Sequence, residues 1–208
     1  MNLIKKTSLA LGLIAAAGVS YAQNATASNG LLGQRFAEIS YLASDLDSTA
    51  DYGHDASVSV NLPLTKALDV GAGYTYSWLT GGPSLHGNTL HTYANAYTVL
   101  DGAKPFVGAA VGYTWASLPF GLSDDDWSWN VSAGVEIPLG AFTLTPKITY
   151  ADDFNGKVGN SDDVWVYSVQ ANYWVNAKTS VFGEVGRTDV HRSSADAWTF
   201  GAGVRFKF

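Results

Sequence analysis

The sequence predicts an all-β fold, a closed antiparallel up-and-down transmembrane β-barrel of about ten strands. Three observations predict it. Segments that alternate between apolar and small polar residues follow one another along the chain. Aromatic residues gather at one end of these segments, on their apolar side. An export signal precedes them, which indicates that the chain leaves the cytoplasm.

The first 22 residues, MNLIKKTSLALGLIAAAGVSYA, have the three parts of a secretory signal peptide. Two lysines form the positive start, residues 9–19 form a short apolar run, and Ser20-Tyr21-Ala22 is a small-x-small cleavage site. The apolar run is too short for a membrane-spanning helix, which needs roughly 20 residues. We therefore expect a signal peptide over residues 1–22 and one mature domain over residues 23–208.

Composition narrows the class of protein further. Cleavage would remove Lys5 and Lys6 and leave 10 basic against 18 acidic residues, a net charge of −8. A charge of this sign argues against a nucleic-acid partner. The chain has no cysteine, so neither disulfides nor cysteine-ligated metals stabilise it. We expect no cofactor and no metal site.

Ten segments have the two-residue period of β-strands. The alternation is weaker in three of them, and in 89–100 neither phase is apolar enough to assign its faces. The seven clear segments are Asp55–Leu62, Leu68–Trp78, Phe106–Trp115, Trp127–Ile137, Phe142–Tyr150, Trp165–Val175 and Trp198–Phe208, and the weaker ones are Arg35–Leu42, Thr89–Leu100 and Thr179–Thr188.

The distribution of aromatic residues favours a membrane barrel over a soluble one. A soluble core has no reason to hold its aromatic residues at one level, whereas a bilayer interface does, because amphipathic rings settle at the depth of the lipid headgroups. Trp174 is the tryptophan that departs from this pattern. The predicted girdle contains Tyr41, Tyr76, Trp78, Tyr113, Trp115, Trp127, Trp129, Tyr150, Trp165, Tyr167, Trp198 and Phe200.

The connections between segments alternate in length, which fits a membrane barrel with short turns at one end and long loops at the other. Four are short, and the five long ones are predicted over 43–54, 79–88, 116–126, 151–164 and 189–195. The sheet must also be closed, because strands can satisfy their N–H and C=O groups in hydrocarbon only when no edge is left unpaired. The last segment must therefore pair with the first.

The end of the chain, FGAGVRFKF, together with the signal peptide and the whole mature chain, resembles the small outer-membrane β-barrels of Gram-negative bacteria, of the OmpA/OmpX and porin-like kind. The resemblance implies an outer-membrane location and eight strands as the alternative to ten. It also implies that Phe206 and Phe208 belong to the signal that the barrel-assembly machinery reads. Outer-membrane lipid and lipopolysaccharide are the partners it implies, and we expect a monomer.

Charged residues on the polar phase are predicted to point into the barrel. They are Glu38, Asp69, Glu136, Lys147, Glu184, Arg205 and Lys207. In one interpretation they pair in a polar network that fills the interior and holds the barrel together. In the other they form a charged constriction of a narrow channel.

The predicted long loops are acidic, with 13 of the 18 carboxylates in or beside them, from Asp45 to Asp196. Simple solvation explains this, and binding of divalent cations is the alternative, since hard cations favour carboxylates.

Two histidines have an acidic neighbour, His54 beside Asp55 and His191 beside Asp189, but no catalytic motif surrounds them. We expect a non-catalytic barrel with a structural or surface-interaction role, a narrow porin-like channel as the alternative, and a lipid-modifying enzyme or protease as the least favoured.

Overall fold

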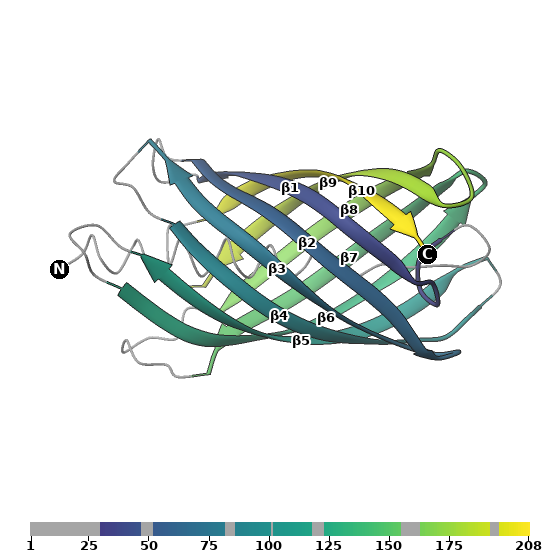
Figure 1. The fold of residues 1–208 in the computed structure, drawn as a ribbon, viewed down its shortest axis with the longest axis horizontal. Helices are drawn as coiled ribbons and strands as arrows, with labels where there is room; N and C mark the ends of the chain where they lie inside the picture. The colour runs from purple at the N-terminus through teal and green to yellow at the C-terminus, as the bar shows by residue number, and fades with distance from the viewer. Residues whose placement is uncertain are drawn as a thin grey trace.

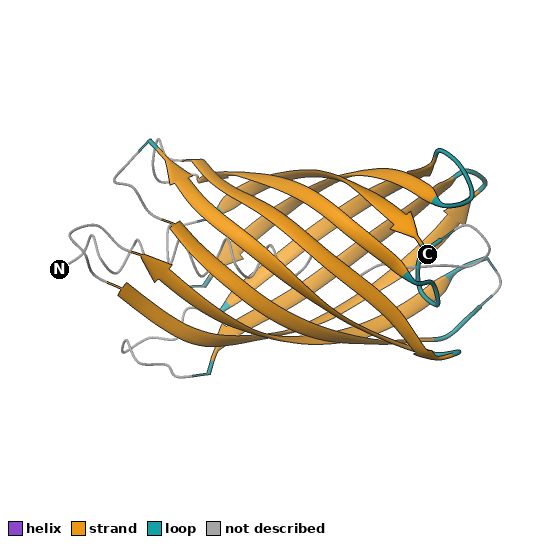
Figure 2. Cartoon of the chain, viewed as in Figure 1, coloured by secondary structure: helices purple, strands orange, loops and turns teal. Residues whose placement is uncertain are grey.

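The computed structural model is a closed barrel of ten β-strands, drawn in Figures 1 and 2. It describes residues 30–46, 52–81, 86–100, 102–117, 123–154, 163–191 and 196–208, so the predicted signal peptide lies outside the described residues. Among the residues described, no helix is long and apolar enough to cross a membrane. The strands are β1 (Phe36–Leu46), β2 (Tyr52–Thr65), β3 (Leu68–Thr80), β4 (His86–Tyr97), β5 (Lys104–Ser117), β6 (Ser123–Leu139), β7 (Phe142–Asp153), β8 (Val164–Trp174), β9 (Thr179–Val190) and β10 (Ala197–Lys207).

Every strand pairs antiparallel with the strands before and after it, and β1 pairs with β10 to close the sheet. In the closing ladder Phe36 lies opposite Lys207 and Tyr41 lies opposite Ala202. The predicted number of ten strands and the closure by the last segment are confirmed. The tilt of the strands against the long axis is plain in Figure 1.

The two ends of the barrel differ in their connections. We call the end with the β2–β3, β4–β5, β6–β7 and β8–β9 connections the short-turn end, and the opposite end the long-loop end. Gly140 sits in the two-residue turn between β6 and β7 with φ of +67°, a backbone conformation that favours glycine. The C-terminus lies at the short-turn end, on the right of Figure 1.

The strands extend further toward the long-loop end than the sequence predicts. Asp125 pairs with Trp115 and Asp152 with Trp129, so these acidic residues lie on strands rather than in loops. The predicted boundaries were wrong there because ladder pairing continues after the apolar alternation stops. Most of the acidic residues that the structure describes at the long-loop end are therefore placed by the sheet.

A single-layer barrel has only two faces, so a side chain buried on a strand points inward and an exposed one points outward. In β8, Trp165, Tyr167 and Val169 are exposed, while the residues between them are buried. This alternation also assigns β4, the segment with unassigned faces: His91 and Tyr93 point inward, and Leu90 points outward. The predicted interior is polar, but it also includes an apolar cluster toward the long-loop end, made of Ala151, Val164, Val166 and Val190.

Candidate functional site

The six interior charges that define the predicted site are all buried. They come from six strands, which the closed sheet brings around one interior. Each is at most 7% exposed, as follows: Glu38 on β1, Asp69 on β3, Glu136 on β6, Lys147 on β7, Glu184 on β9 and Arg205 on β10. Lys207, at the end of β10, is partly buried.

Arg205 is the centre of the first interior group. Its Nε donates a hydrogen bond to Glu38, which lies directly opposite it across the closing ladder. Its Nη1 donates to Gln170 Oε1 at 2.9 Å and to Asn172 Oδ1 at 3.2 Å. The guanidinium also lies over the ring of Phe182, 3.9 Å from the ring centroid. One arginine thus links β1, β8, β9 and β10 from the inside.

Two further charges adjoin this group. Gln170 Nε2 donates to Glu184 Oε2 at 2.8 Å, which extends the network along β8 and β9. Lys147 on β7 is buried in the same interior. Opposite charges in a confined interior stabilise one another only while both partners remain.

A second interior group holds the segment that precedes β1. The backbone amide of Leu31 donates to Glu136 Oε2 at 3.2 Å, and that of Gly33 donates to Asp69 Oδ2 at 2.8 Å. Lys104 Nζ donates to the carbonyl of Leu32 at 2.8 Å. Two predicted interior charges therefore bind the main chain of the protein itself, which their place on the polar phase does not reveal.

An apolar group completes this arrangement at the short-turn end. Leu31 and Leu32 are 1% and 2% exposed and pack with Phe36, Tyr97 and Phe106 inside the barrel. Trp174 packs against the same group, and Lys207 Nζ lies 3.8 Å from its ring centroid. Trp174 departs from the aromatic pattern because its side chain points inward. That departure was the available sequence signal for an apolar group inside the barrel.

The interior is different between these charges and the long-loop end. On each strand that carries one of the six charges, the interior positions further toward the long-loop end are mainly hydroxyl residues, small amides or glycines. Asp55 on β2 is a charged residue of this half and accepts a hydrogen bond from Ser77. The other polar or small residues include Ser44, Thr75, Ser77, Thr89, Asn130, Thr149, Thr188, Thr199, Gly73, Gly112 and Gly186.

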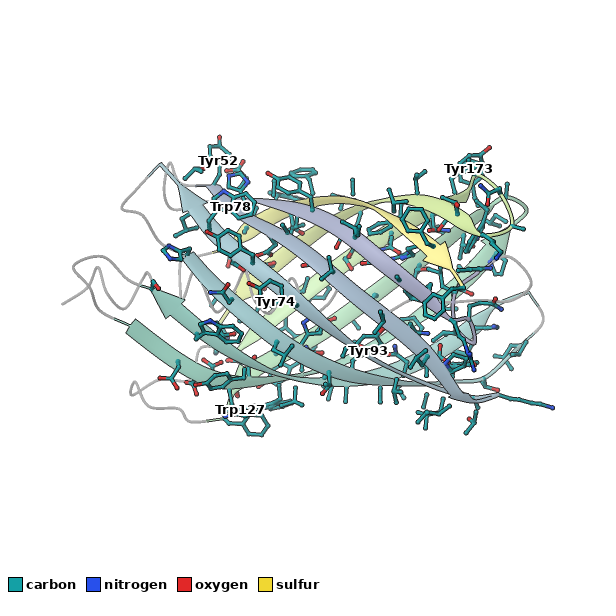
Figure 3. All side chains as sticks on the ribbon, viewed as in Figure 1. Tyr52, Tyr74, Trp78, Tyr93, Trp127 and Tyr173 are labelled. Atoms are coloured by element: carbon teal, nitrogen blue, oxygen red, sulfur yellow. The ribbon has the colours of Figure 1, made fainter. Side chains whose placement is uncertain are left out.

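The outward aromatic residues form separate groups of ring contacts toward the long-loop end. Tyr113 lies 5.1 Å from Trp127 between ring centroids, and Tyr150 lies 5.1 Å from Trp165. Figure 3 shows Tyr52, Trp78 and Trp127 near this end and Tyr173 at the opposite one. Tyr76, Trp115, Trp129 and Trp198 also stand on the outward phase. Phe206 and Phe208 are exposed on the outside at the short-turn end.

The two predicted histidine pairs are placed differently. His54 points outward, where Tyr41 and Thr80 hydrogen-bond its two ring nitrogens, while Asp55 points inward. Adjacent strand residues face opposite sides, so these two side chains cannot act on one substrate. His191 and Asp189 are both exposed. Within the described ranges, no group of three or more histidine and acidic side chains is placed to hold a metal ion.

A closed, tilted, antiparallel barrel with an aromatic girdle and a polar interior defines an integral outer-membrane β-barrel. The chain belongs to the Gram-negative porin family, which its sequence matches over residues 4–193. The protein is therefore located in the bacterial outer membrane. No curated protein matches the sequence.

Solved structures share the fold at low sequence identity. An outer-membrane channel from Pseudomonas putida F1 is 9% identical, with a TM-score of 0.59, and the match covers 89% of this chain and 100% of that one. The translocator domain of the autotransporter NalP from Neisseria meningitidis is also 9% identical, with a TM-score of 0.53 and 92% of each chain covered. At such identity the likeness shows a common architecture.

Proposed function

We propose that this protein is a narrow outer-membrane channel for small polar solutes. The observation that carries the proposal is the division of the interior. A half lined mainly by small hydroxyl residues and glycines, with one apolar cluster on β7, β8 and β9, leads from the long-loop end to a belt of charges around Arg205. Membership of the Gram-negative porin family supports it. The side chains that line the narrowest part of such a pore determine which solutes pass.

Three polar side-chain atoms at the belt lack a hydrogen-bond partner among the described residues. Arg205 Nη2, Asn172 Nδ2 and Asn95 Oδ1 are buried and make no hydrogen bond within the part of the chain that the structure describes. Buried polar atoms of this kind normally bind water or a ligand. The belt can therefore exchange hydrogen bonds with water or a small polar molecule.

Charge at the long-loop end favours cations. Asp45, Asp125, Asp153 and Asp189 are exposed there. A rim of one charge sign raises the local concentration of the opposite ion. We therefore expect the channel to pass small cations in preference to anions, which a reversal potential under a salt gradient measures.

A matched pair of substitutions tests the channel in planar bilayers. Thr75 points into the interior between the charges and the long-loop end, and Thr92 points outward on the neighbouring strand. Thr75→Trp fills the passage and should lower the unit conductance of every opening, whether openings are steady or intermittent. Thr92→Trp adds the same indole to the outer wall and should leave the unit conductance unchanged. Equal unit conductance in both variants and the wild type would rule out a passage through the interior.

A non-catalytic structural barrel is the second candidate. It is supported by the way in which the Arg205 network and residues 31–36 occupy the short-turn end. Such a barrel should remain electrically silent in the wild type and in variants that remove contacts to residues 31–34. Bilayers that contain folded protein and show no openings in any of these forms would favour the structural role.

A further inference from the structure

We propose that residues 30–34 are a plug that gates the short-turn end, and that Asp69, Glu136, Lys104 and Asn61 form its binding site. The inference rests on the proposed channel function and assigns its regulation. In the position described here the segment closes the mouth, and its release opens the passage.

The polar contacts of the plug are made through its main chain. Asp69 and Glu136 accept hydrogen bonds from two backbone amides, while Lys104 and Asn61 donate to the carbonyls of Leu32 and Gln34. The four side chains come from β2, β3, β5 and β6, so they hold the segment across the mouth rather than against one strand. Three of the four hydrogen bonds involve a charged side chain, which makes them stronger than neutral ones.

The apolar contacts of the plug are made by two adjacent side chains. Leu31 and Leu32 are almost completely buried against Phe36, Tyr97 and Phe106. Moving them into water would expose their apolar surface, so the closed position is favoured. Polar replacements at these two positions should therefore weaken closure without touching the sheet.

The plug is attached in a way that permits release. It lies outside the β-ladders, and its internal hydrogen bond runs from the amide of Gln34 to the carbonyl of Leu31, 3.0 Å away. Gly33 has φ of +98°, which favours glycine, and a Cβ there would lie 2.9 Å from the Tyr97 hydroxyl. Residues 30–34 can thus leave the mouth by rotation near Gln34 while every strand pair of β1 remains.

Single-channel recording of the full protein tests the gate. We expect two variants to raise the open probability about tenfold or more: the double substitution Leu31→Asn with Leu32→Asn, and the single substitution Lys104→Met. Each removes contacts of the closed plug whose free energy corresponds to at least such a factor. In the leucine variant, which leaves the charges of the wall intact, the unit conductance of each opening should be unchanged. Leu64→Asn is the control, because Leu64 is 62% exposed at the same end. A wild type that is steadily open and unaffected by these changes would overturn the gate and leave the channel intact.

A second measurement reads the plug position without any current. The chain has no cysteine, so Leu32→Cys and Leu64→Cys each carry one thiol. In detergent-solubilised folded barrels, a maleimide-polyethylene glycol should modify residue 32 at least about tenfold more slowly than residue 64, because a closed plug must open before its thiol reacts. Lys104→Met should accelerate modification of residue 32 only. Equal rates at the two positions would overturn the plug, whereas slow labelling together with electrical silence of all variants would overturn the channel and, with it, the gating role.

Discussion

At the scale of single residues, Arg205 carries the most consequential contacts of the interior. It is 0% exposed and binds Glu38, Gln170 and Asn172, while its guanidinium stacks on Phe182. A buried charge of this kind adds little net stability compared with an apolar pair of the same shape, but it is costly to leave without its partner. The sequence predicts that Arg205 and Glu38 point inward, and their direct pairing follows only from the register of β1 against β10.

Removing one member of this pair should destabilise the barrel more than removing both charges. We expect Arg205→Met or Glu38→Gln alone to lower the free energy of unfolding by about 3–5 kcal/mol, since each leaves a buried charge behind. The double variant should lose less than either single variant, because it leaves no unpaired buried charge. Urea unfolding in lipid vesicles, followed by tryptophan fluorescence, measures all four proteins. Additive losses would show that the two side chains act independently.

At the scale of elements, β4 shows why its faces could not be assigned from the sequence. Tyr93 and Tyr97 point inward, so the aromatic residues that mark the outer phase elsewhere lie on the inner phase here. The neighbouring strand makes room for them. A Cβ on Gly71 would lie 2.2 Å from Tyr93 Cζ and 2.4 Å from the carbonyl oxygen of Val60. The reason for an inward tyrosine is thus a glycine on another strand, which periodicity within one segment does not reveal.

Two glycine substitutions separate this packing effect from the general effect of glycine. Gly71→Ala should destabilise the barrel by about 1–3 kcal/mol, because the new methyl group meets a ring and a backbone oxygen at a tightly packed position. Gly183 is exposed on the outer face, and the nearest atom to a Cβ there is 3.9 Å away. Gly183→Ala should therefore leave stability unchanged or raise it slightly. The midpoint of urea unfolding for the two variants checks the difference, and similar midpoints would contradict it.

At the scale of the whole molecule, the two ends of the barrel carry different charge. Exposed acidic residues surround the long-loop end, while Lys66 and Lys178 are exposed in short turns. Barrels of this class place their longer loops outside the cell and their short turns in the periplasm. We therefore expect the acidic end to face the medium and the plug to face the periplasm.

Cysteine labelling on intact cells checks this orientation. His191 is exposed at the long-loop end and Ala177 is exposed in the turn between β8 and β9. A membrane-impermeant maleimide should modify His191→Cys on intact cells, and Ala177→Cys only after the outer membrane has been opened. The cysteine-free wild type gives the background signal. The reverse result would place the short turns outside.

The sequence predicts much of this architecture but only part of the site. Alternation, the aromatic girdle and the need to satisfy backbone groups in hydrocarbon are sufficient for ten strands and closure, because each is a property of single strands or of the sheet as a whole. The plug is different. Gly30–Gln34 has no periodicity, and its binding depends on Asp69, Glu136 and Lys104 meeting at one mouth, which only the folded register determines.

The seam between β1 and β10 has a consequence for how the barrel folds. All other ladders join segments that follow one another along the chain, whereas this one joins residues 36–46 to residues 197–207. Its contact order is therefore far higher than that of any hairpin, and loop-closure entropy opposes it until the remaining sheet has shortened the distance between the two ends. Until that moment the curved sheet has two unpaired edges, which in hydrocarbon leaves a full row of amide and carbonyl groups unsatisfied on each. Closure of the barrel is thus the step that makes the folded chain compatible with the bilayer. The start of β1 and the end of β10 meet at the short-turn end, where the amide of Phe208 donates to the carbonyl of Arg35 at 3.3 Å.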